Sequence, residues 1–150
     1  MIFIKDKIKK ILLSTKSDII LEDQIKNNYN LTSINYLLLI DDYYIAIQNM
    51  SSNKPNLNDV NQFINNIQQL SNILQKPIIG IYLSYSDLTH NAKNAFNNIN
   101  KSKINIKCVS IYDNNQDNLI NKLIKYLYTH KIYIYYNDDS SYMINTELDL

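Results

Sequence analysis

The segment that most constrains the fold runs from Asn35 to Met50, where two apolar stretches meet at the pair Asp41-Asp42. Two short apolar runs separated by turn-forming residues predict a tight antiparallel hairpin. Asn35 opens the first predicted strand, and Gln48 closes the second, with Met50 two positions further on. Side chains two residues apart on a strand point to the same face. The hairpin is therefore expected to present Gln48 and Met50 together, with Asn35 nearby.

This layout resembles the metal-binding hairpin of the PD-(D/E)xK, or restriction-endonuclease-like, nucleases. In that family an Asp precedes the first apolar strand, and an acidic residue, any residue and a Lys close the next strand. Asn35, Gln48 and Met50 stand at those positions and carry no charge. The resemblance implies a nuclease-like frame with a degenerate site, without catalytic residues and without a metal. Glu22 matches an acidic residue that the family often carries on the helix before its hairpin, although an ordinary surface Glu is the alternative.

The chemistry of such a site explains why these replacements matter. Mg²⁺ is held by anionic oxygens together with substrate phosphate, and it then activates the attacking water. Asn35 and Gln48 offer neutral carbonyl oxygens only, and Met50 supplies no cation for the developing charge. Asp41 and Asp42 are the nearest carboxylates in sequence, but at about 3.3 Å per residue they lie roughly 15–20 Å from the other end of the hairpin. We therefore expect no metal-dependent catalysis.

Apolar periodicity along the rest of the chain predicts an α/β fold. Helices are expected over about 4–12, 17–28, 57–74, 87–98 and 119–127, and strands over 78–84, 104–111, 131–136 and 142–144 in addition to the hairpin. At 150 residues the chain is expected to form a single domain, 1–150, with a central mixed β-sheet flanked by helices. Residues 17–111 resemble the restriction-endonuclease-like core in order and length. Residues 116–144 form a helix-strand extension.

Composition limits the function classes. Gly80 is the only glycine, which excludes the glycine-rich phosphate loops of P-loop and dinucleotide-binding proteins, and we expect no cofactor. His90 and His130 show no metal-ligand spacing. The lone Cys108 lies in an apolar stretch and predicts a buried thiol in a reducing, intracellular, soluble protein. No apolar segment reaches the length of a membrane span or forms a signal peptide, so no membrane partner is expected.

The charged residues bear on the partner. All 15 cations are Lys, against 14 acids, so no strongly basic field predicts nucleic acid binding. The 26 Ile and 24 Asn indicate an AT-rich genome, which also accounts for the missing Arg. Binding of nucleic acid, if it occurs, is expected to be independent of sequence because Arg is the usual reader of bases.

Three functions remain open from the sequence. The first is a catalytically inactive nuclease-like protein with a nucleic-acid-binding or architectural role. The second is an α/β interaction or structural protein that does not bind nucleic acid, and the third is an active nuclease with displaced metal ligands. Tyr133 and Tyr135 share a face of a predicted strand and suit either base stacking or a homodimer interface. Candidate nucleic-acid contacts are Lys54, Gln68, Lys76 and Lys93.

Overall fold

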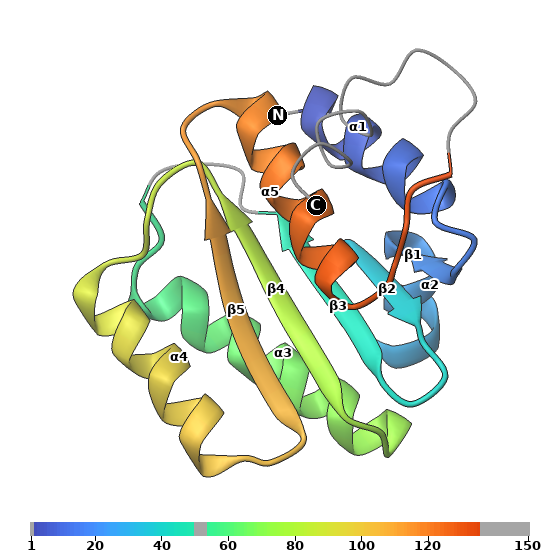
Figure 1. Ribbon diagram of the computed structural model, residues 1–150. Coiled ribbons are helices and arrows are strands. Elements are labelled where there is room, and N and C mark those ends of the chain that lie inside the picture. The colour runs from blue at the N-terminus through green and yellow to red at the C-terminus, as the bar shows by residue number, and fades with distance from the viewer. Residues whose placement is uncertain (1, 50–53, 136–150) are drawn as a thin grey trace.

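A five-stranded mixed sheet forms the centre of the computed structural model, which describes residues 2–49 and 54–135 (Figure 1). The strand order follows the sequence, and the first three strands form an antiparallel meander while β3, β4 and β5 run parallel. This confirms the predicted α/β fold with a mixed sheet. The strands are β1 (Asp18–Leu21), β2 (Tyr36–Leu39), β3 (Tyr44–Asn49), β4 (Ile78–Ser84) and β5 (Ile106–Tyr112).

Helices cover both faces of the sheet. One face packs against α1 (Ile2–Leu13) and α5 (Gln116–Thr129), and the opposite face packs against α2 (Glu22–Tyr29), α3 (Leu57–Leu74) and α4 (His90–Ser102). Helices α3 and α4 lie on the same face because they connect successive parallel strands in the same direction, and such crossovers are right-handed. The central strands β3 and β4 are apolar on both faces, as expected for strands covered on both sides.

The predicted hairpin is present. Leu39 of β2 lies across from Tyr44 of β3, and the backbone N–H of Ile40 donates to the carbonyl of Tyr43 at 3.0 Å, which closes the turn. The turn therefore contains Asp41 and Asp42 at the end of the hairpin that is remote from Asn35. Side chains alternate between the two helical layers along both strands, with Leu38 facing α1 and α5 and Leu37 facing α2, α3 and α4.

Two of the predicted elements are wrong. The helix expected over 17–28 is instead a strand followed by a helix, because β-branched residues before Glu22 pair with β2. The strand expected over 131–136 does not form in residues 131–135. Ile132 and Ile134 are buried beside α1 and α5, but Tyr135 donates its backbone N–H to Ser14 rather than to a strand. The strand expected over 142–144 lies outside the described residues.

Apart from α2, which lies between β1 and β2, the order α1, three antiparallel strands, α3, β4 follows the helix, meander, helix, strand order of the restriction-endonuclease-like core. The unexpected strand β1 supplies the third strand of the meander, so the observed chain matches that order more fully than the predicted one. Within the described ranges, the structure contains no helix that combines the length and apolar character needed to span a bilayer.

Gly80 explains how closely α3 approaches the sheet. A Cβ atom at this position of β4 would lie 2.9 Å from side-chain atoms of Phe63 and Ile67 on α3. Ordinary carbon contacts need about 3.5–4.0 Å. The absence of a side chain therefore allows α3 to pack directly over β4, which fixes the helix that follows the hairpin.

Candidate functional site

The candidate site is a row of three polar side chains across the meander. Tyr36 pairs with Leu21 on β1 and with Ile47 on β3. One further step along both antiparallel ladders sets Asn35 opposite Glu22 on one side and opposite Gln48 on the other. Strand alternation directs Asn35 and Gln48 toward the face covered by α2, α3 and α4, whereas Glu22 begins α2 and its carboxylate also reaches Lys5 of α1 on the opposite face. The structure therefore brings Asn35 and Gln48 together and adds Glu22, while Met50 lies outside the described residues.

Asn35 is the centre of this row and is only 3% exposed. Its Nδ2 donates to Glu22 Oε1 at 3.1 Å, and its Oδ1 accepts the backbone N–H of Asn49 at 2.7 Å. Both ends of the carboxamide are thus hydrogen-bonded within the protein. An Asp side chain could accept from Asn49 but has no hydrogen to donate to Glu22 when ionised. The neutral amide is the side chain that fits this position.

Glu22 has a cation as its second neighbour. Lys5 Nζ of α1 lies 3.8 Å from Glu22 Oε1, and both side chains are about half exposed, each at 46%. The hydroxyl of Tyr36 donates to the carbonyl of Lys5 at 2.8 Å, which ties α1 to the start of β2. Burial, the charge of Glu22 and the charge of Asp6 raise the pKa of Tyr36 to about 12, so its hydroxyl stays protonated as a donor. The one carboxylate of the row is therefore balanced by Lys5.

The end of β3 carries polar atoms that are buried. Gln48 Oε1 and both polar atoms of the Asn49 side chain have no hydrogen-bond partner among the described residues. Strand alternation directs Gln48 toward the α3 face and Asn49 toward the α1 and α5 face. These groups can donate and accept hydrogen bonds but contribute no charge. Sequence reasoning did not single out Asn49, and a lone Asn in a chain with 24 of them gives no signal.

The residues of the row do not fit a divalent metal. Glu22 is the only carboxylate among Glu22, Asn35 and Gln48, and the Oδ1 of Asn35 already accepts a backbone N–H. Across residues 2–49 and 54–135, no three His, Cys, Asp or Glu side chains gather in a way that would hold a metal ion. Mg²⁺ sites depend on anionic oxygen ligands, which one ion-paired carboxylate does not provide. The row is instead a hydrogen-bonded link between α2, β2 and β3.

Ion pairs surround the same edge of the sheet, where the parallel strands end. The four pairs recorded between described residues are Lys5–Glu22, Lys7–Asp117, Lys93–Asp87 and Lys122–Asp113. They follow the carboxyl ends of the strands because Asp87 follows β4 and Asp113 follows β5. Each lysine in this set is thus matched by a carboxylate. Sequence reasoning did not find these pairs, because the partners lie on different elements.

The pKa values of two of these acids reflect their surroundings. Burial acts to raise the pKa of Asp87, but hydrogen bonds from Lys93 and from the backbone N–H of Leu88 outweigh it, and the pKa is lowered. The backbone N–H of Asn115, followed by Lys122, lowers the pKa of Asp113. Both carboxyls therefore remain ionised through the neutral range.

The candidate nucleic-acid contacts do not form one surface. Lys54 and Lys76 flank opposite ends of the 18-residue helix α3, which at 1.5 Å per residue separates them by roughly 27 Å. Lys76 donates to the carbonyl of Asp41 at the far end of the hairpin. Gln68 lies on α3 and is half-buried, and Lys93 is engaged by Asp87. The structure brings none of these four into the row of Glu22, Asn35 and Gln48.

The remaining sequence candidates have structural roles. Cys108 is buried and free, as predicted, and burial raises its pKa to about 12. His130 caps the carboxyl end of α5, and its Nδ1 lies 3.2 Å from the hydroxyl of Tyr43. Burial and the charge of Lys107 lower the pKa of His130. Burial of Cys108 and the contact of His130 with Tyr43 explain these two residues structurally, and no catalytic role is needed.

Comparisons with known proteins give fold-level similarity only. No protein-family model matches the chain, and no curated protein is significantly similar in sequence. The crystal structure of a repair endonuclease from Pyrococcus abyssi is similar at a TM-score of 0.41 and 15% identity, over 53% of this chain and 32% of that one. The crystal structure of AF1548, a protein of unknown function, is similar at a TM-score of 0.49 and 11% identity, over 72% and 56%. The chain thus spans about a third and just over half of these two proteins.

Proposed function

We propose that the chain is a catalytically inactive nuclease-like protein that has a nucleic-acid-binding or architectural role. The observation that carries this proposal is the state of Asn35. It stands where the resemblance places a metal-binding Asp, and its carboxamide is hydrogen-bonded to Glu22 on one side and to the backbone of Asn49 on the other. A position that would hold a metal ligand serves here as a neutral cross-link.

The lack of charge at the row argues against catalysis on physical grounds. Phosphoryl transfer by this kind of nuclease requires a cation that polarises the phosphate and lowers the pKa of water. The row offers one carboxylate, Glu22, and its charge is balanced by Lys5 at 3.8 Å. Gln48 adds a neutral amide. A phosphate placed here would meet no metal and no properly placed base.

Nucleic acid binding in this proposal depends on lysine alone. Lys5, Lys7, Lys9 and Lys10 lie on α1, and Lys5 approaches Glu22 of the row. Lysine binds phosphate as a point charge and does not read bases in the bidentate way that Arg does. Because the carboxylates of the ion pairs compete with phosphate, the affinity is expected to be modest, independent of sequence and strongly reduced by salt.

A second function is favoured by the same ion pairs. At the edge where the parallel strands end, each recorded lysine is matched by an acid, so the field that would attract a polyanion is weak. An interaction or structural protein of this fold that never contacts nucleic acid would need no positive field. The two functions differ in one measurable property, which is affinity for DNA at low salt.

A gel-shift titration with duplex, single-stranded and branched DNA at low salt tests the choice. Binding that is similar for unrelated sequences and falls steeply with salt supports the first function. The variant Asp113→Asn releases Lys122, whose Nζ lies 3.1 Å from Asp113 Oδ2, and should tighten binding several-fold. Asp42→Asn makes the same charge change in the hairpin turn at the opposite end of the sheet and should leave it unaltered. No binding to any of the three DNAs supports the second function.

A further inference from the structure

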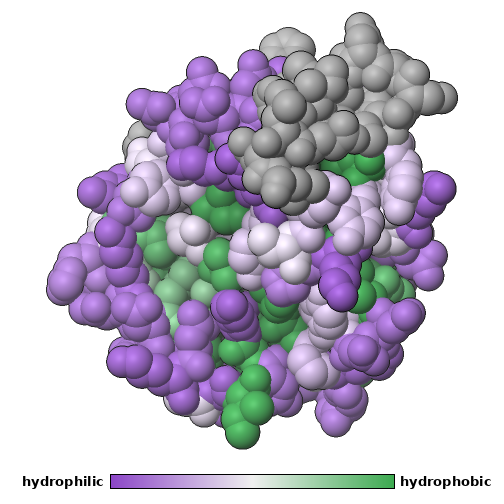
Figure 2. All heavy atoms as spheres, viewed as in Figure 1, coloured by the Kyte–Doolittle hydropathy of each residue, from purple (hydrophilic) through white to green (hydrophobic). Residues whose placement is uncertain are grey.

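The face of the sheet that packs against α1 and α5 is left partly open over strands β4 and β5. Ile45 of β3 is fully buried, whereas Ile79, its neighbour on β4, and Val109 on β5 are only partly buried. Figure 2 shows apolar residues in a hollowed part of this side of the molecule, bordered by hydrophilic side chains. Parallel strands are normally covered on both faces. Contiguous apolar surface that stays accessible marks an interaction site.

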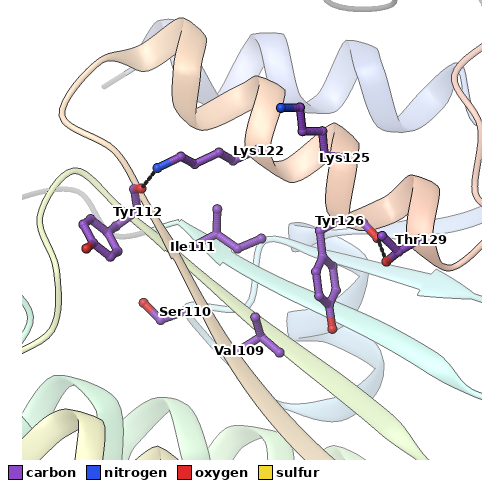
Figure 3. A pocket seen from close by; sticks show the side chains of 8 residues that line it. All are labelled: Val109, Ser110, Ile111, Tyr112, Lys122, Lys125, Tyr126 and Thr129. Carbon is purple, nitrogen blue, oxygen red and sulfur yellow. Dashed lines mark hydrogen bonds between the residues drawn. The ribbon is translucent and has the colours of Figure 1, made fainter. Parts of the chain in front are cut away.

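Two cavities lie in this open part of the face. The larger, of about 390 Å³, lies between β5 and α5, with Tyr112 and Tyr126 at its two ends (Figure 3). Its Lys122 is already held by Asp113 at 3.1 Å. The smaller, of about 310 Å³, lies where the parallel strands begin. We call it the strand-start pocket, and its lining includes Asp42, Tyr43, Ile79, Ile104, Lys107 and His130.

Ile104 projects from the rim of this pocket. It lies two residues before β5 and is fully exposed. A single exposed apolar side chain is ordinary on a protein surface, but this one borders an apolar hollow. A projection and a hollow side by side on one surface are what a two-fold contact requires, because each copy then offers the projection that the other receives.

The pocket also carries charges of both signs. Asp42 in the hairpin turn and Lys107 on β5 both line it, and both are exposed. Strand β4 separates β3 from β5, so at about 4.8 Å between neighbouring strands the two charges stand roughly 10 Å or more apart. Neither belongs to an ion pair recorded between described residues. A two-fold contact allows the acid of each copy to meet the lysine of the other.

We propose that two copies of the chain associate through this face about a two-fold axis. Ile104 of each copy enters the strand-start pocket of the other, and Asp42 of each copy faces Lys107 of the other. The pocket lies before the start of β3, whereas Gln48 lies near its end, so the dimer leaves the row of Glu22, Asn35 and Gln48 open. This interaction goes beyond the proposed function and does not depend on nucleic acid.

The contact is with the face of the sheet and not with its edges. On the edge strand β5, the side chain of Asn100 accepts from the backbone N–H of Cys108 at 2.7 Å and donates to its carbonyl at 2.9 Å. On the other edge strand, β1, the backbone N–H of Leu21 donates to the side chain of Gln24 at 3.2 Å. A side chain thus occupies backbone groups on each edge, which hinders continuation of the sheet into a second copy.

Sedimentation equilibrium of the full chain without DNA measures the association. The mass should rise with concentration to twice that of one chain and no further, because a two-fold contact is closed. Ile104→Ser should raise the dissociation constant about tenfold or more, because each copy loses a buried apolar side chain. Ile73→Ser removes the same side chain from an exposed position of α3, on the opposite face, and should leave the constant unaltered. The gel-shift comparison with Asp42→Asn is made below the dissociation constant, so that the two tests stay separate.

Charge reversal distinguishes this contact from other dimers. Asp42→Lys and Lys107→Glu should each weaken self-association, because each places like charges at the facing positions. A mixture of the two variants should form mixed dimers, because every charge of one variant then faces an opposite charge of the other. The double variant should associate with itself about as tightly as the parent. A monomer into the millimolar range, growth beyond a dimer, an Ile104→Ser variant as tight as the parent, or no association in the mixture would each overturn the proposal.

Discussion

The hydrogen bond between Asn35 and Glu22 predicts the effect of a single-atom change. In Asn35→Asp, an oxygen replaces the Nδ2 that donates to Glu22 Oε1 at 3.1 Å. The side chain is 3% exposed, so the introduced carboxylate has little access to water. The other oxygen still accepts from the backbone of Asn49. The change therefore replaces one attraction by one repulsion and leaves the rest of the site as it was.

The size of the effect follows from two contributions. Loss of a hydrogen bond to a charged group costs about 1.5–3 kcal/mol. Two carboxylates about 4 Å apart repel by about 4 kcal/mol at an effective dielectric constant of 20. Glu22 is about half exposed, so solvent screening reduces the second contribution to roughly 1–2 kcal/mol. We expect Asn35→Asp to lower the free energy of unfolding by about 2.5–5 kcal/mol at pH 7.

Urea denaturation at two pH values provides the assay. The neighbouring carboxylate raises the pKa of the introduced carboxyl in the folded state, so the variant loses stability as pH rises through that pKa and regains it in acid. The double variant Glu22→Gln with Asn35→Asp restores a donor facing an acceptor and should recover most of the loss. An Asn35→Asp variant as stable as the parent at pH 7, or a double variant no more stable than the single one, would refute the reasoning.

Three further outcomes are expected. Gly80→Ala should destabilise the protein by about 1–3 kcal/mol in thermal or urea unfolding, because the new Cβ meets α3 side chains at 2.9 Å. Burial, aided by the charge of Lys107, lowers the pKa of His130, so stability should fall as pH drops below the unfolded value of about 6.5; in His130→Gln that dependence should weaken. The triple variant Asn35→Asp, Gln48→Glu, Met50→Lys should melt at a higher temperature with Mn²⁺ than without it, and an unchanged melting temperature would show that no metal site forms.

Most of the fold is predictable from apolar periodicity. The long stripe of α3 and the β-branched run of β4 each match one template clearly, and both elements form close to the expected bounds. The errors arise where short apolar runs fit two templates. Residues 18–21 form a strand because they pair with β2. Residues 131–135 remain outside the sheet because their apolar side chains pack against α1 and α5 instead. In such segments, contacts with neighbouring elements of the fold determine which secondary structure forms.

The sequence predicts where Asn35 and Gln48 lie in the hairpin, but not the hydrogen bonds that they make. The register of the hairpin is enough to bring Asn35 and Gln48 to one face. Glu22, which the sequence analysis noted, reaches Asn35 because it directly follows strand β1, and the sequence did not predict that strand. The donor and acceptor roles of Asn35 depend on side-chain orientation, which sequence spacing does not specify. Ion pairs such as Lys122–Asp113 join residues on different elements, and no local pattern marks them.

The absence of cleavage is the most direct test of the central claim. The full chain is incubated with plasmid DNA, single-stranded DNA and RNA in Mg²⁺ and, separately, in Mn²⁺, and the products are separated by electrophoresis. Because Asn35 is held as a neutral cross-link between Glu22 and Asn49, all three substrates should remain intact. Cutting that a chelator stops and that Glu22→Gln abolishes would contradict the account, and it would identify Glu22 as part of an active metal site.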